Sequence, residues 1–213
     1  MAKEAAPAAV AITGRAPYGS QSDRRERAKA ATRSRLLGAT CEALLGSTRG
    51  DIKVDDIVSA AQVSRATFYL HFASIDEALG AVRADMIARL DAEYDHLASI
   101  ERPEFVEVRT WLVEMLAMCR HHRSMVLALM RASGLPGASF DARAYYDGVI
   151  ARLAVAHQAF RNARTDCAAR ADALLLLLQI EGMIRYFVAA EGGDEEAVMV
   201  DRIAEGLCRF IAC

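Results

Sequence analysis

The stretch Val54–Leu79 reads VDDIVSAAQVSRATFYLHFASIDEAL. Its apolar spacing predicts a short helix over 54–61 and a second short helix over 65–72. Gln62-Val63 lies between them as a tight turn, and Ser64 is placed to cap the second helix through its hydroxyl. The stretch therefore predicts two short helices joined by a turn.

Phe68 and Phe72 are four residues apart, so they lie on one side of the second short helix. We expect them to pack against apolar residues of a longer helix over 24–46, which leaves the opposite side of the short helix exposed. A long helix followed by two short ones describes a helix-turn-helix unit, in which the last helix enters the major groove of DNA.

The rest of the chain predicts further helices and almost no strand alternation. The expected ranges, with Ser74 and Asp194 as caps, are 75–98, 104–122, 124–132, 140–163, 167–190 and 195–212. Together with the first three they make an all-α protein of nine helices. We expect a flexible arm over 1–23, a DNA-binding unit over 24–75, and a ligand-binding and dimerisation unit over 76–213.

The net charge of −2 hides an asymmetry. Residues 24–75 contain nine basic and five acidic side chains, a net of +4, whereas residues 76–213 have a net of −6. A basic helix-turn-helix unit suits the phosphates of DNA. The five cysteines form no C-x-x-C pair, and no apolar run is long enough for a membrane helix or a secretion signal, so we expect a cytoplasmic protein.

The run Val-Ser-Arg-x-Thr-Phe-Tyr-x-His-Phe at 63–72 resembles the DNA-binding signature of the TetR family of bacterial transcriptional regulators. The strong resemblance covers about residues 32–79, and the remaining helices are similar to the family only in layout. The resemblance implies a homodimer that binds a palindromic operator in double-stranded DNA, and a body that binds an effector.

The resemblance also implies roles for residues of the second short helix. Arg65, Ala66 and Thr67 stand at groove-facing positions, and Ser64 and Tyr69 stand where hydroxyls hold phosphates. Arg65 could instead contact phosphate alone, since phosphate contacts outnumber base contacts. The alternative for Tyr69 is a core aromatic.

Other positions near the groove are less regular. His71 could reach DNA or fill the boundary with the next helix. Lys53 replaces the family's usual Ser or Thr cap, which removes a side-chain acceptor but adds a cation that could contact phosphate. Ile75 stands where the family often has a phosphate-binding Lys. The basic run 24–35 could follow the DNA backbone, or could be a solvated helix face.

In the body, an apolar stripe at helical spacing predicts one wall of a pocket for a small, largely apolar effector. This wall is Trp111, Met115, Met118, His122, Met125 and Leu129. The facing wall is expected from Phe140, Tyr145, Tyr146, Val149 and Leu153, and either Gln179 or Glu181 could anchor a ligand. The alternative is that the stripe is ordinary core.

The two last helices predict a four-helix dimer interface. The expected dimerisation residues are Leu174, Leu178, Met183, Phe187, Ile203, Leu207 and Phe210. The alternative is that these residues form the core of a monomer. Glu181 in the same apolar helix needs a partner, which Arg185 four residues later can supply.

Metal and cofactor sites are not expected. Cys119, His121 and His122 are close in sequence, but adjacent side chains point about 100° apart on a helix and cannot both face one ion. The chain contains no nucleophile elbow or glycine-rich phosphate loop, so we do not expect an enzyme. The sequence therefore favours a ligand-responsive repressor, with a DNA-binding regulatory or architectural protein without an effector as the alternative.

Overall fold

The computed structural model describes residues 21–47, 52–132, 140–190 and 192–212, and all regular structure in these ranges is helical. The ten helices are α1 (Gln21–Gly46), α2 (Val54–Ala61), α3 (Arg65–His71), α4 (Ile75–Ser99), α5 (Phe105–His121), α6 (Arg123–Ala132), α7 (Ala142–Leu153), α8 (Gln158–Asn162), α9 (Cys167–Ala189) and α10 (Asp194–Ile211).

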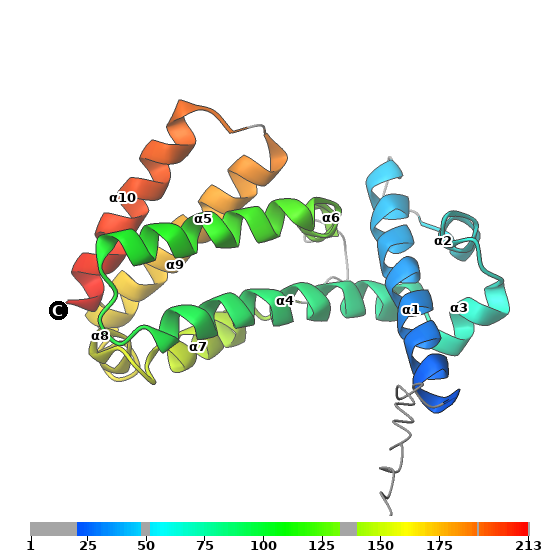
Figure 1. Ribbon diagram of the computed structural model, residues 1–213, viewed down its shortest axis with the longest axis horizontal. Helices are drawn as coiled ribbons and strands as arrows, with labels where there is room; N and C mark the ends of the chain where they lie inside the picture. The colour runs from blue at the N-terminus through cyan, green and yellow to red at the C-terminus, as the bar shows by residue number, and fades with distance from the viewer. Residues whose placement is uncertain (1–20, 48–51, 133–139, 191, 213) are drawn as a thin grey trace, which may run out of the picture.

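Helices α1, α2 and α3 lie together at one end of the molecule, and we call them the head (Figure 1). The core of the head contains Leu36, Leu44 and Ile57, and Phe68 and Phe72 are buried in it as expected. The extent of α2 and the helix-turn-helix order are confirmed.

The helix ends in the head also follow the sequence. The Thr67 amide donates to Ser64 Oγ at 3.0 Å, and the Glu77 amide donates to Ser74 Oγ at 3.1 Å, so both predicted caps are confirmed. Lys53 has no side-chain cap bond, and its amide instead donates to Asp56 Oδ2 at 3.2 Å. Gln62 between α2 and α3 has the left-handed φ of 53° that a tight turn requires.

The second core lies in the body, which we define as α4 to α10. The long helix α4 runs from the head into the body, beside α5 and α7 (Figure 1). Trp111, Leu112, Met115 and Leu116 of α5 are buried in the centre of this core.

Helix α6 belongs to both cores. Ala128 and Ala132 are buried against the head, and Met125 and Leu129 pack against both hydrophobic clusters. The start of α4 also contributes to the core of the head through buried residues. A displacement of α6 would therefore disturb the packing of the head and of the body at the same time.

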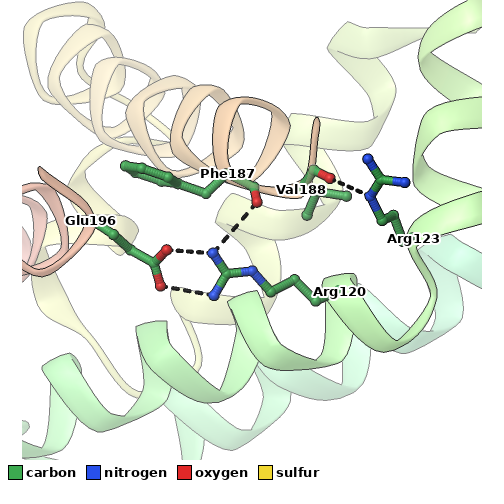
Figure 2. Close-up of polar contacts among 5 residues, drawn as sticks. All are labelled: Arg120, Arg123, Phe187, Val188 and Glu196. Atoms are coloured by element: carbon green, nitrogen blue, oxygen red, sulfur yellow. Dashed lines mark hydrogen bonds and ion pairs between the residues drawn. The ribbon is translucent and has the colours of Figure 1, made fainter. Parts of the chain in front are cut away.

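Helix α9 ends against the corner between α5 and α6. A helix leaves its last four carbonyl groups without partners inside the helix. Here the Arg123 guanidinium donates to Val188 O at 2.9 Å (Figure 2). It also donates to Ala189 O at 3.1 Å. Arg123 therefore caps α9 from a neighbouring helix.

Arg120, at the end of α5, extends the same arrangement. It donates through both terminal nitrogens to the carboxylate of Glu196 on α10, with one bond at 2.8 Å, and also to Phe187 O at 3.4 Å (Figure 2). The ion pair raises the pKa of Arg120. One side chain thus joins α5 to α9 and α10, through partners 67 and 76 positions further along the chain.

The expected count of nine helices is wrong by one, because the range 140–163 contains α7 and α8. Val149, Leu153 and Phe160 keep helical spacing across the break, so periodicity could not reveal it. The carbonyl groups of residues 154 and 155 accept bonds from Arg161 at 3.1 and 3.2 Å. A second small correction is that Gly193, not Asp194, is the N-cap of α10.

Candidate nucleic-acid interface and ligand cavity

Helix α3 is held on one side and open on the other. Phe68 is fully buried and packs edge-on against the Tyr69 ring, with 5.4 Å between ring centroids. The Tyr69 side chain is itself 52% exposed, which excludes the alternative of a core aromatic. Arg65 and Ala66 are exposed on the same helix.

The other predicted DNA-contacting residues lie around this exposed side of α3. Ser64 and Lys53 are exposed, and Thr67 and His71 are half-buried. Ser64 Oγ is already used as a cap and lies 2.9 Å from Thr67 Oγ1, so its hydroxyl is held in place at the start of α3. We call the group Lys53, Ser64, Arg65, Ala66, Thr67, Tyr69 and His71 the α3 surface.

One exposed residue of α3 was not predicted. Leu70 is 81% exposed between Tyr69 and His71. Apolar side chains at such positions can contact the methyl group of thymine. A leucine surrounded by polar groups could have been recognised from the helical phase, because Phe68 and Phe72 already define the buried side.

Arg65 has a partner that its local sequence did not reveal. Its guanidinium forms an ion pair with Asp55 of α2 at 3.3 Å, across the turn between the two helices. Both side chains are about three-fifths exposed, at 61% and 64%. Asp55 contacts only one terminal nitrogen of Arg65, so the other N–H groups of the guanidinium remain for a phosphate or a guanine.

The basic run at the start of α1 is exposed, as a solvated face or a DNA-tracking segment would be. Arg33 is held above the ring of Phe72 at 5.4 Å from its centroid. The positive charge of α1 is thereby fixed near the end of α3.

The body contains a cavity of about 140 Å³ between α4, α5, α6, α7 and α9. Its lining residues are Arg83, Met86, Ile87, Leu90, Tyr94, Cys119, Val126, Leu129, Met130, Phe140, Tyr145, Tyr146, Leu177, Glu181, Ile184 and Arg185. We refer to this space as the cavity.

Five of the predicted ligand residues, Leu129, Phe140, Tyr145, Tyr146 and Glu181, line the cavity. The rest of the predicted α5 and α6 wall does not. Trp111 and Met115 are buried in the core instead, and the Trp111 indole donates to Glu93 O at 2.8 Å. Val149 is likewise buried in the core.

The remaining residues expected in the wall also lie away from the cavity, because the phase of their helices turns them from it. Met118 and Met125 are half-buried and pack against the core, and His122 is the C-cap of α5. Burial, followed by the nearby Arg89, lowers the pKa of His122. Gln179 is exposed on the other side of α9, where it lines an outer groove.

One end of the cavity is polar. The Tyr146 hydroxyl donates to Glu181 Oε2, and Arg185 Nε donates to Glu181 Oε1 at 3.1 Å. The predicted Glu181–Arg185 pair is therefore confirmed. Burial, followed by the negative charge of Glu181, raises the pKa of Tyr145, and burial with the Glu181 hydrogen bond raises that of Tyr146.

The outer face of α9 and α10 carries exposed apolar side chains. They are Leu175, Leu178, Tyr186, Val198 and Met199. Of the predicted dimerisation residues, Leu178 is exposed here, and Leu174 and Phe210 are half-buried.

Four predicted dimerisation residues are placed differently. Met183, Phe187, Ile203 and Leu207 are buried in the core of the body, although Met183 and Ile203 also line the outer groove beside Gln179. These residues do lie on the last two helices, as expected. However, α9 is apolar on nearly all sides, and the spacing of its apolar residues does not show which side faces inward.

Over the described ranges, no group of three or more His, Cys, Asp and Glu side chains is arranged to hold a metal ion. The rings of His121 and His122 are nearly perpendicular, at 88°. None of the helices in the described part of the chain is long and apolar enough to cross a membrane.

The described helices thus form a helix-turn-helix unit carried on an all-helical body with an internal cavity. No family model matches the chain, and no curated relative matches it. Solved structures do match the chain. A TetR-family transcriptional regulator from Pectobacterium atrosepticum is similar at 19% sequence identity, over 91% of this chain and 97% of that chain, with a TM-score of 0.58.

Two further solved structures are similar. A transcriptional regulator from Aquifex aeolicus matches at 18% identity over 83% of this chain and 97% of that chain, with a TM-score of 0.57. A gamma-butyrolactone receptor matches at 16% identity over 85% of this chain and 98% of that chain, with a TM-score of 0.52. The chain therefore has the all-α fold of TetR-family transcriptional regulators.

Proposed function

We propose that the protein is a dimeric, DNA-binding transcriptional regulator in which α3 enters the major groove. The observation that carries this proposal is the two-sided construction of α3. Phe68 and Phe72 anchor it in the head, while Arg65, Ala66 and Tyr69 are exposed on its free side. A helix that is fixed behind and polar in front can present its side chains to base edges.

A dimer would supply two such helices to a palindromic operator. Leu175, Leu178 and Tyr186 of α9, with Val198 and Met199 of α10, supply an exposed apolar surface for a second copy of the chain. Leu175, Tyr186 and Met199 line one outer groove, and exposed apolar surface of this kind is typical of an interface between proteins. We therefore assign the proposed dimer contact to this outer face.

A small, largely apolar effector would bind in the cavity and release the DNA. Leu129 supports this coupling, because it lines the cavity and also packs against the core of the head. A ligand that moves α6 would then shift the position of the head. The similar gamma-butyrolactone receptor is a precedent for a small-molecule ligand on this fold. In this mechanism the protein is a repressor.

DNA binding is tested by fluorescence anisotropy with DNA that flanks the gene of this protein. Arg65→Ala is expected to weaken binding by a factor of about 10 to 100, because one bidentate base contact is worth about 1 to 3 kcal/mol. Tyr69→Phe removes only a hydroxyl and should weaken binding by a factor of about 5.

The matched control is Arg102→Ala, which removes an exposed arginine from the connection between α4 and α5. It should leave DNA affinity unchanged. A uniform loss for Arg65→Ala on every DNA sequence, with a smaller salt dependence, would show a phosphate contact in place of base reading. Equal affinity of Arg65→Ala and Arg102→Ala would refute the assignment of α3.

A further inference from the structure

Two hydroxyl groups at the cavity lack partners. Tyr94 on α4 and Tyr145 on α7 both line the cavity, and Tyr94 is only 5% exposed. Across the residues that the structure describes, neither hydroxyl donates or accepts a hydrogen bond. Neither oxygen is among the described side-chain atoms that are both fully buried and unpaired, so each hydroxyl opens onto the cavity, where it can hydrogen-bond to a bound molecule.

The neighbouring polar groups, by contrast, have hydrogen-bond partners. Tyr146 uses its hydroxyl on Glu181, and the indole of Trp111 beside Tyr94 uses its N–H on a backbone carbonyl. Burial first, and then Tyr145 and Glu181, raise the pKa of Tyr94, so its hydroxyl stays protonated. Tyr94 and Tyr145 can therefore each donate a hydrogen bond to an acceptor.

Charge restricts the acceptor. Both oxygens of Glu181 are engaged, one by Tyr146 and one by Arg185. The Glu181 carboxylate lines this end of the cavity, so it would repel an anion placed beside it, and removal of the anion from water would add a further cost. A cation would meet Arg185 on one side and Arg83, which lies 5.6 Å from the Phe140 ring centroid, on the other. A neutral molecule avoids both penalties.

Size restricts the ligand further. The cavity volume of about 140 Å³ is similar to the roughly 150 Å³ of a cavity that holds one benzene molecule. Its walls are aliphatic or aromatic, with Met86, Leu90 and Leu177 among them. One ring with a short substituent fits this space, whereas two fused rings would require the walls to move.

We infer that the cavity binds a neutral, single-ring compound whose carbonyl oxygen accepts hydrogen bonds from Tyr94 and Tyr145. A carbonyl oxygen has two lone pairs, so it can serve both hydroxyls at once. This inference deepens the proposed function, since it names the class of effector, but binding in the cavity can be measured without DNA.

The test uses isothermal titration calorimetry with four probes. Acetophenone is the neutral single-ring ketone, and α-methylstyrene has the same shape with a methylene group in place of the carbonyl oxygen. Benzoate supplies the anion, and 2-acetylnaphthalene supplies the second ring. Acetophenone is expected to bind at least about 10-fold more tightly than each of the others, because the others lose hydrogen bonds, add charge or exceed the volume.

Two variants assign the effect to the hydroxyls. Tyr94→Phe and Tyr145→Phe should each weaken acetophenone binding by a factor of about 5, and should leave α-methylstyrene binding unchanged. A merely structural role would weaken both probes equally. Tyr69→Phe, in the head, is the matched control and should change neither. If Tyr94→Phe does not fold by circular dichroism, Tyr145→Phe decides the question.

The inference is overturned if acetophenone does not bind, or if it binds no better than α-methylstyrene or benzoate. If this happens while the protein still binds DNA, the proposed function stands and the effector class is wrong. If acetophenone binds through both tyrosines but does not change DNA affinity, the class of ligand is supported and the ligand-responsive role is refuted.

Discussion

Replacing Arg120 with methionine is expected to lower the free energy of unfolding by about 2 kcal/mol. The side chain makes two bonds to Glu196 and one to Phe187 O. Two charges about 4 Å apart attract by about 4 kcal/mol at an effective dielectric constant of 20. Desolvation of both groups offsets part of this attraction.

Exposure sets the size of the net effect. The side chains of Arg120 and Glu196 are 37% and 22% exposed. Fully exposed pairs contribute about 0.2 to 1 kcal/mol, and removal of one partner from a buried pair costs about 3 to 5 kcal/mol. This pair lies between the two cases. A loss of about 2 kcal/mol corresponds to a fall of about 4 to 8 °C in Tm for a chain of this length.

The assay is urea unfolding of the wild type, Arg120→Met, Glu196→Gln and the double variant. All four are measured at one fixed protein concentration, since the proposed dimer would make stability depend on concentration. The four free energies form a double-mutant cycle, and we expect a coupling energy of about 1 to 1.5 kcal/mol. The Arg65–Asp55 pair is the control, because it is more exposed and should couple by less than about 0.5 kcal/mol. An Arg120–Glu196 coupling no larger than that of the control pair would refute the reasoning.

Three further predictions follow from which side chains are buried and which are exposed. Burial lowers the pKa of His157, so the folded state binds a proton less readily than the unfolded state. The free energy of unfolding should therefore fall as the pH drops below about 6.5. His157→Gln should reduce this dependence of stability on pH, which urea unfolding at several pH values measures. Burial raises the pKa of Cys119 to about 12, so iodoacetamide should modify the exposed Cys167 long before Cys119 in the folded protein, and mass spectrometry would reveal the opposite order. Leu178→Asp should shift the protein toward monomer in analytical ultracentrifugation, whereas Val155→Asp, at another exposed apolar position, should not, and an unchanged dimer in both would rule out the outer face of α9.

Local patterns in the sequence predicted the head well. The spacing of Phe68 and Phe72 identified the buried side of α3, and Ser64 and Ser74 identified two helix starts through their caps. These features depend on residues within a few positions of one another. The Arg65–Asp55 pair was missed because it crosses the turn between two helices.

The cavity could be predicted only in part, because its lining depends on how helices are rotated against one another. Leu90 and Tyr94 of α4 line it, and their spacing was visible, but nothing local distinguishes a cavity wall from a core stripe. The same limit applies to α9. Its apolar residues predicted an interface helix, yet Met183 and Phe187 are buried in the protein interior.

The most direct test of the proposed function is a footprint of the protein on DNA that it binds. If α3 reads the major groove in each subunit of a dimer, two protected half-sites should be centred one helical turn of DNA, about 10 base pairs, or a multiple of this distance apart. Arg65→Ala should weaken the protection of both half-sites equally. A single protected segment without two-fold symmetry, or a footprint that Arg65→Ala leaves unchanged, would contradict the account.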